Sequence, residues 1–393
     1  MRKMRKWKYL LVCMAFCAML QVASVAKADT VIDANPATTE KTAKVKSTTE
    51  KTTTEKTTTE TTTGKTTTEQ SSNASTEEEK IKDGWNRDKT CYYQDGNKVK
   101  GVQVIDEELY YFTSKGNLFT KKGLRTVEGK TFYFMKNHTM KTGVVKVNGK
   151  RYYFQKNGER YEEEGLHKID KNYYLFNSDY TLKSGWYRDK NNNRYYFDKR
   201  SYAALKGWNY IKGYKYYFSK KGVLQQDVRE ILKKQSSYVI KINRTACCVT
   251  VYAKDGKKGY TIPVVSFVCS TGSDTPTGTF YTGVKHRWHE LFGPCWGQWT
   301  TQITGNILFH SVYYDVYNDN KSLNVAAYNK LGTMASHGCV RLRAGDAKWI
   351  YDNCKDKTKV VIYNNKKKVG PFDKPTVDKL SKDHTWDPTD SEI

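Results

Sequence analysis

Seven glycines recur along the middle of the chain at separations of 17 to 22 residues, and each is followed by Trp, Val or Leu. An aromatic cluster, such as the Tyr-Tyr-Phe at 152–154, follows about nine residues later, after a turn such as Asn148-Gly149. Each unit is typical of a short β-hairpin that cannot bury its apolar face alone. Stacking buries those faces, so the pattern predicts a β-hairpin solenoid of about seven repeats over residues 84–225. The repeating glycines are Gly84, Gly101, Gly123, Gly143, Gly165, Gly185 and Gly207.

Units that run Gly-Trp, turn, Tyr-Tyr-Phe resemble the cell-wall-binding, or choline-binding, repeat family. That resemblance implies aromatic cages for a quaternary ammonium, held by cation–π attraction. Here only Trp85, Trp186 and Trp208 follow the repeating glycines. We therefore expect the repeats to bind an anionic or glycan cell-wall polymer in place of choline, with most of the aromatic rings forming the solenoid core.

The first residues favour export. Residues 2–8 are basic, residues 9–20 are almost wholly apolar, and Ala-Lys-Ala ends at Ala28. This predicts a signal peptide over 1–28 and a secreted, wall-associated protein; an uncleaved membrane anchor is the alternative. The Thr-rich stretch 29–80 has the composition of a disordered linker.

Charge indicates the kind of partner. Sixty-seven Lys and Arg residues against 41 Asp and Glu leave a formal charge of +26, which favours an anionic partner. Export excludes nucleic acid as a natural partner and leaves a wall polymer, with the membrane met only transiently during export. We expect the mature chain to keep seven cysteines, an odd number that leaves at least one thiol unpaired.

After the repeats, apolar runs alternate with turns over residues 236–364, which predicts a β-rich globular domain. One helix is expected within it, over residues 344–353. Residues 365–393 are polar and are interpreted as a tail. The fold class predicted for the whole chain is mainly β.

The strongest chemical signal is the run Ser-His-Gly-Cys-Val-Arg-Leu. Its cysteine, Cys339, has His337 and Arg341 two residues away on either side, and both favour a thiolate. Gly338 lets the backbone turn toward a substrate oxygen. A second imidazole, His310, ends an apolar run and has the placement of a general base at a strand end.

Taken together, these motifs resemble the L,D-transpeptidase (YkuD) catalytic domain. Its signature is a His, a variable interval and then Ser/Thr-His-Gly-Cys-x-Arg/Asn. Ser-Thr-Gly at 270–272 and Thr-Pro-Thr-Gly-Thr-Phe at 275–280 also match the strand and turn beside the family's site. The resemblance covers residues 238–363.

The resemblance implies a cysteine-dependent enzyme in which Cys339 is the nucleophile and His310 the general base, with the Ser311 carbonyl orienting the imidazole. These two residues are 29 positions apart, a long interval, so His337 is the second candidate for the base. The oxyanion hole falls on the main-chain amides around His337, Gly338 and Cys339.

In the same way Arg341 is placed where a substrate carboxylate is held, and the partners are peptidoglycan stem peptides. The implied reaction passes an acyl group through a Cys339 thioester and forms 3→3 cross-links, without a metal or an organic cofactor. A zinc site from His310, His337 and Cys339 is a weaker idea, since no fourth ligand has suitable spacing.

Three points stay open from the sequence alone. The same acyl-enzyme can be hydrolysed, which would make the protein an L,D-carboxypeptidase or endopeptidase. A wall-bound adhesin or scaffold with an inert Cys339 is the non-catalytic alternative. The aromatic segment 285–300 suits either a lid over the cleft or a core hairpin, and its His286 and His289 are interpreted as ordinary surface or core residues.

Overall fold

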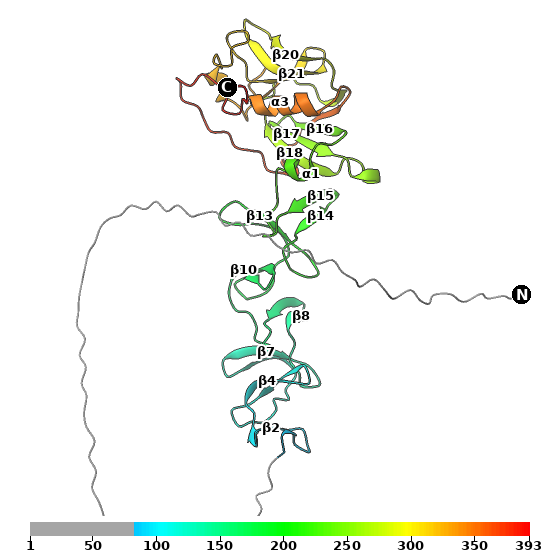
Figure 1. Ribbon diagram of the computed structural model, residues 1–393, viewed down its shortest axis with the longest axis vertical. Helices are drawn as coiled ribbons and strands as arrows, with labels where there is room; N and C mark the ends of the chain where they lie inside the picture. Colours follow the sequence, from blue (N-terminus) through cyan, green and yellow to red (C-terminus); the bar gives the residue numbers. More distant parts are fainter. Residues whose placement is uncertain (1–81) are drawn as a thin grey trace, which may run out of the picture. The chain divides into compact units, whose positions relative to one another are not determined.

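The computed structural model describes residues 82–393 (Figure 1). The predicted signal peptide (1–28) and Thr-rich linker (29–80) lie outside the described residues. Among residues 82–393, no helix is both long enough and apolar enough to cross a bilayer.

Residues 84–218 form seven antiparallel hairpins, one for each repeating glycine. In six of them this glycine pairs with the phenylalanine that ends the second strand, as Gly143 does with Phe154. The strands are β1 (Gly84–Trp85), β2 (Tyr92–Gln94), β3 (Asn97–Lys98), β4 (Gly101–Ile105), β5 (Glu108–Phe112), β6 (Gly123–Val127), β7 (Lys130–Phe134), β8 (Gly143–Val147), β9 (Lys150–Phe154), β10 (Gly165–Ile169), β11 (Asn172–Phe176), β12 (Gly185–Arg188), β13 (Arg194–Phe197), β14 (Gly207–Ile211) and β15 (Tyr214–Phe218).

Backbone geometry explains the glycines and the turns of this repeat. Gly143 has a φ of 71°, in the left-handed region that an L side chain rarely adopts. Asn148 and Gly149, which join β8 to β9, have φ values of 49° and 82°. Positive φ at both central residues is the geometry of a type I′ turn, whose twist matches that of a two-stranded hairpin.

Main-chain hydrogen bonds join each hairpin to the one before it. Met140 N donates to Leu109 O and Arg160 N to Thr131 O, both at 2.7 Å, and the later units repeat this bond. The phenylalanines that end the second strands are buried, Phe154 completely. Burial of such a side chain contributes roughly 1.5 to 3 kcal/mol. The predicted solenoid is therefore confirmed, and these rings form its core, whereas many of the tyrosines remain half-buried.

The C-terminal domain has two sheets, with α3 packed against β21 and β22 of the second one. The five-stranded sheet has the order β18-β17-β16-β24-β19 and the four-stranded sheet the order β20-β21-β22-β23. The strands are β16 (Tyr238–Asn243), β17 (Cys248–Ala253), β18 (Ile262–Val268), β19 (Gly278–Tyr281), β20 (Lys285–Glu290), β21 (Trp296–Thr304), β22 (Ile307–Ser311), β23 (Val340–Leu342) and β24 (Lys359–Tyr363). The helices are α1 (Arg229–Leu232), the 3-10 helix η1 (Gly256–Lys258), α2 (Val325–Tyr328) and α3 (Ala344–Asn353).

Helix α3 has the bounds that the sequence predicts, and its apolar face closes the domain core. Ala347 and Ile350 are completely buried in one cluster with Phe309 of β22 and Val360 of β24. The predicted fold class, mainly β with a hairpin solenoid before a β-rich domain, is confirmed.

The C-terminal segment 365–393 contains no helix or strand but is closely packed. Phe372 is buried in the aromatic cluster of the last hairpins. Asp373 forms ion pairs with Arg188 at 2.8 Å and Arg194 at 3.4 Å, both in the repeats. Farther on, the buried carboxylate of Asp387 accepts a hydrogen bond of 2.7 Å from the amide at the start of α3. The segment thus connects the last repeats to the C-terminal domain.

We predict that Asp387→Ala lowers the free energy of unfolding by about 1 to 3 kcal/mol, because it leaves a buried amide of α3 without an acceptor. Denaturant unfolding of the full chain measures this. Asp378→Ala removes an exposed carboxylate of the same segment and should change stability by less than about 0.5 kcal/mol. Equal effects of the two substitutions would contradict the capping role.

Candidate active site

The site is built on two neighbouring parallel strands. In the register of β22 and β23, His310 lies beside Arg341 and Phe309 beside Val340. Side chains alternate between the two faces of a sheet, and paired residues share a face. Phe309 and Val340 are therefore directed into the core, where both are completely buried, while His310 and Arg341 face the other way. Cys339, two residues before Arg341, lines the same cleft as these two side chains.

The loop that carries Cys339 is held by its carbonyl groups. Asp274 N donates to His337 O at 3.1 Å, and Thr275 Oγ1 donates to Gly338 O at 2.7 Å. Ser336 Oγ donates to the carbonyl of Cys339 itself at 2.6 Å. The carbonyl groups of residues 337–339 thus accept hydrogen bonds. Their N–H groups, by contrast, donate no hydrogen bond to a main-chain or side-chain atom of the described residues. The loop thus presents unpaired amides, the arrangement that binds an oxyanion.

Close approach of a second segment makes this loop possible. An ideal Cβ on Gly272 would lie 2.1 Å from Ser336 O and 2.3 Å from His337 O. Both contacts involve main-chain atoms, which cannot swing away as a flexible side chain can. Residue 272 therefore has to be glycine for the loop to keep its place.

Cys339 is a half-buried, protonated thiol. Its Sγ lies 3.4 Å from Asn306 O, to which it can donate. Burial raises the pKa of Cys339, and the weaker influences of the Leu308 backbone and the Arg341 charge in the opposite direction do not cancel this effect. The flanking charges that the sequence offers do not by themselves produce a thiolate, so the thiol needs a base to become a nucleophile.

His310 is buried at 2% exposure and is neutral near pH 7. Burial and, to a smaller extent, the charge of Arg341 lower the pKa of His310 to about 3. The Ser311 backbone raises this pKa without cancelling the two effects. The Nδ1 of His310 has no hydrogen-bond partner among the described residues. The expected orienting role of the Ser311 carbonyl therefore stays a prediction, and the Ser311 hydroxyl accepts a bond from Gln298 N at 3.0 Å.

Arg341 keeps part of its guanidinium unsatisfied. One terminal nitrogen donates to Ala335 O at 3.0 Å, and the guanidinium carbon lies 5.1 Å from the centre of the Tyr313 ring. Its buried Nε has no partner in the described part of the chain. A guanidinium held by one bond and an aromatic face retains donors for a carboxylate.

These residues surround a cleft of about 710 Å³. One wall is the β20–β21 hairpin, with its connecting loop at 291–295. Trp299 of this hairpin is buried in the core. Phe292 in the loop is 90% exposed, and the centre of its ring lies 5.5 Å from the centre of the exposed His337 ring. The segment is therefore a core hairpin whose loop borders the cleft. His286 and His289 also line the cleft, and the centres of their rings are 4.9 Å apart.

Other residues of the site are not evident from sequence motifs. Gly297 of β21 packs on His310, and an ideal Cβ there would lie 3.0 Å from Nδ1. Asn306 and Tyr313 contact the reactive groups from outside the recognised run. Cys295 lines the same cleft, and burial raises its pKa. All seven cysteines of the described residues are unpaired.

Residues 82–393 contain no group of three or more His, Cys, Asp or Glu side chains arranged to hold an ion. His310, His337 and Cys339 line one cleft, with His337 exposed on the loop and His310 buried.

Residues 237–362 match the family model of the L,D-transpeptidase catalytic domain, and residues 121–162 match that of the choline-binding repeat. The two resemblances drawn from the motifs are thus confirmed over these residues.

A curated relative is the Bacillus subtilis (strain 168) protein named "Putative L,D-transpeptidase YciB". It is 40% identical over 119 residues, which are 28% of this chain and 59% of that protein. The chain thus spans less than two thirds of this relative.

Two solved structures are also similar to parts of the chain. Choline binding protein F from Streptococcus pneumoniae is 27% identical, with a TM-score of 0.26, over 33% of this chain and 43% of that one. An L,D-transpeptidase from Stackebrandtia nassauensis is 19% identical, with a TM-score of 0.24, over 34% of this chain and 60% of that one.

We predict that Gly272→Ala lowers the free energy of unfolding by about 1 to 3 kcal/mol, because the added methyl group meets main-chain oxygens of the Cys339 loop. Gly370→Ala is the matched control. Its Cβ would be 3.3 Å from one hydroxyl oxygen, so stability should change by less than about 1 kcal/mol. A Gly272→Ala protein as stable as this control would show that the close approach is not required.

We also predict that iodoacetamide alkylates Cys339 slowly at pH 7. The alkylation rate should increase with pH and reach half its maximum above pH 8.5, which is about the pKa of a free cysteine. The reason is that burial raises the pKa of this thiol. Peptide mapping of the full chain at a series of pH values separates Cys339 from the other thiols, and Cys339→Ser is the control. A midpoint below about 7 would mean a resting thiolate and would contradict this description.

Proposed function

We propose that the protein is a peptidoglycan L,D-transpeptidase that forms 3→3 cross-links through a thioester on Cys339. The observation that carries the proposal is the common face of β22 and β23, where a thiol, a neutral imidazole and a partly free guanidinium line one cleft. The match of this segment to the L,D-transpeptidase catalytic domain supports the same reaction class.

In the acylation step, neutral His310 takes the proton of Cys339, and the thiolate attacks the carbonyl between the third and fourth residues of a tetrapeptide stem. The new C–S bond replaces the C–N bond to D-alanine, and His310 returns its proton to the departing amine. The unpaired amides at 337–339 hold the carbonyl oxygen while it carries negative charge.

In the second step, the side-chain amine of a neighbouring stem attacks the thioester. A C–N bond forms as the C–S bond breaks, the amine loses a proton to His310, and the proton finally returns to the thiol. Arg341 positions a stem carboxylate through donors that the protein leaves free.

His310 is favoured as the base over the loop imidazole by its place on β22, beside the strand that follows Cys339. Its ring is unprotonated at neutral pH, the form that accepts a proton, although the low pKa that burial gives it also makes it a weaker base than a free imidazole. His337, the second candidate, is exposed and contacts Phe292 on the rim of the cleft.

Hydrolysis of the same thioester is the second candidate function. The loop at 291–295 borders the cleft without covering it, since Phe292 is 90% exposed, and water therefore competes with the amine. Such a protein would be an L,D-carboxypeptidase or endopeptidase with the same nucleophile.

The repeats would hold this enzyme, exported by its signal peptide, on the wall and raise the local substrate concentration. One potential cage already contains a cation. Trp186 makes edge contacts with Tyr196 at 5.2 Å and Tyr216 at 5.5 Å, and the Arg194 guanidinium lies 4.6 Å from the Trp186 ring. An internal cation there supports a wall ligand other than choline.

We predict that His310→Asn lowers the rate of D-alanine release from a disaccharide-tetrapeptide about 100-fold or more, the usual contribution of a general base. His337→Asn should lower it less than about tenfold, because the amide of this residue is retained. Chromatography of the products also separates cross-linked dimer from free tripeptide, and so transfer from hydrolysis.

Equal losses for both histidine variants would contradict the assignment of His310 as base. Wild-type protein without any D-alanine release, in a folded and reduced sample, would favour the adhesin or scaffold.

A further inference from the structure

A second large cavity lies on the five-stranded sheet, away from Cys339. It encloses about 1000 Å³ and is lined by strand residues, by the turn before β24 and by the chain that follows β24. We call it the lysine groove, after Lys241, Lys355, Lys357, Lys359 and Lys368 in its lining.

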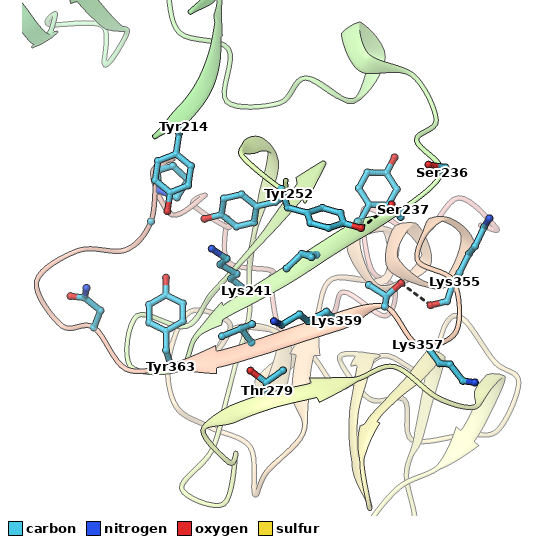
Figure 2. Close-up of a pocket in the computed structure, with 18 of the residues that line it drawn as sticks. Tyr214, Ser236, Ser237, Lys241, Tyr252, Thr279, Lys355, Lys357, Lys359 and Tyr363 are labelled. Carbon is cyan, nitrogen blue, oxygen red and sulfur yellow. Dashed lines mark hydrogen bonds between the residues drawn. The ribbon is translucent and has the colours of Figure 1, made fainter. Parts of the chain in front are cut away.

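Strand alternation forms the floor of the groove. Ile240, Ile242, Val360 and Ile362 are buried in the domain core. Lys241 of β16 and Lys359 of β24 are next to these buried residues in their strands and therefore occupy the opposite face. Figure 2 shows both lysines projecting from adjacent strands into the same space.

Aromatic rings surround these charges. Tyr252 of β17 and Tyr363 of β24 come from the sheet, and Tyr214 comes from the last hairpin of the repeats. The Lys241 ammonium lies 4.7 Å from the centre of the Tyr252 ring, and the Tyr214 and Tyr252 rings are 5.8 Å apart (Figure 2). Tyr252 is buried and holds the Lys241 ammonium on its ring, whereas Tyr214 and Tyr363 are half-buried. The rings and hydroxyl groups of these two tyrosines suit the carbon skeleton and hydroxyls of a sugar or polyol.

The positive charge of the groove is uncompensated. Asp356 is the one acid among its described lining residues, and none of the five lysines forms an ion pair with another residue of the described range. By contrast, the nearby Lys215 is paired with Asp255 at 2.9 Å. The groove therefore attracts an anion that the chain itself does not supply.

The charges are arranged in a row. Lys357 precedes β24, Lys359 begins it, and Lys368 lies beyond its far end, where Asn243 contacts the Lys368 carbonyl at 3.0 Å. Five strand residues span about 13 Å. Charges spread over this length suit a chain with repeated anionic groups more than a single small anion.

Lysine is a suitable ligand for phosphate groups. Its ammonium acts as a point charge that pairs with phosphate oxygens in any orientation, whereas arginine requires the geometry of its fork. The lining residues include five lysines and no arginine. We propose that the lysine groove binds an anionic polymer with a phosphodiester-linked polyol backbone, independently of the chemistry at Cys339.

The test is binding of a fluorescent glycerol-phosphate oligomer to the full chain, followed by anisotropy at an ionic strength of about 0.15 M. Lys241→Gln with Lys359→Gln should weaken binding about tenfold. The matched control, Lys257→Gln with Lys382→Gln, removes the same charge from two exposed lysines outside the groove and should change binding less than twofold. A polyglutamate with the same number of charges lacks the hydroxylated backbone that Tyr214 and Tyr363 would contact, and should bind at least about tenfold more weakly.

Equal binding by the two double variants would overturn the proposal, as would polyglutamate that binds as tightly or a wild-type chain without affinity for the oligomer. Unchanged thermal unfolding of both variants verifies the fold. Because the readout is binding, its outcome is separate from that of the transpeptidase proposal.

Discussion

The parallel pairing of β22 with β23 is the interaction on which the rest of the site depends. Its register places His310 beside Arg341 and brings Cys339 to the start of β23, although the two reactive residues are 29 positions apart in the chain. The opposite face of the same pair, Phe309 and Val340, is fixed in the core. A shift of one residue would exchange these faces, so core packing and the position of the reactive groups are coupled.

Desolvation then determines the chemistry of these groups. Burial raises the pKa of Cys339 and lowers that of His310, so both are neutral at rest. A neutral acid and a neutral base in one cleft cost less to bury than an ion pair, and the charges arise only when substrate is attacked. The unpaired amides of the 337–339 loop are positioned beforehand for that charge.

The sequence predicts the local features well. The hairpin repeats, helix α3 over residues 344–353 and the short run around Cys339 each depend on neighbours in the chain. Contacts across the fold are harder to predict. The packing of Gly297 on His310, the capping of α3 by Asp387 and the lysine groove join segments far apart in sequence. A lone glycine or aspartate does not reveal such a partner, and the 365–393 segment therefore has the composition of a polar tail although it is packed.

The most direct test of the account is the mass of the intact, full-length protein after incubation with a disaccharide-tetrapeptide. The account predicts an adduct that lacks D-alanine, located on Cys339 and absent from Cys339→Ala. An adduct on another residue, or D-alanine release that persists in Cys339→Ala, would contradict it.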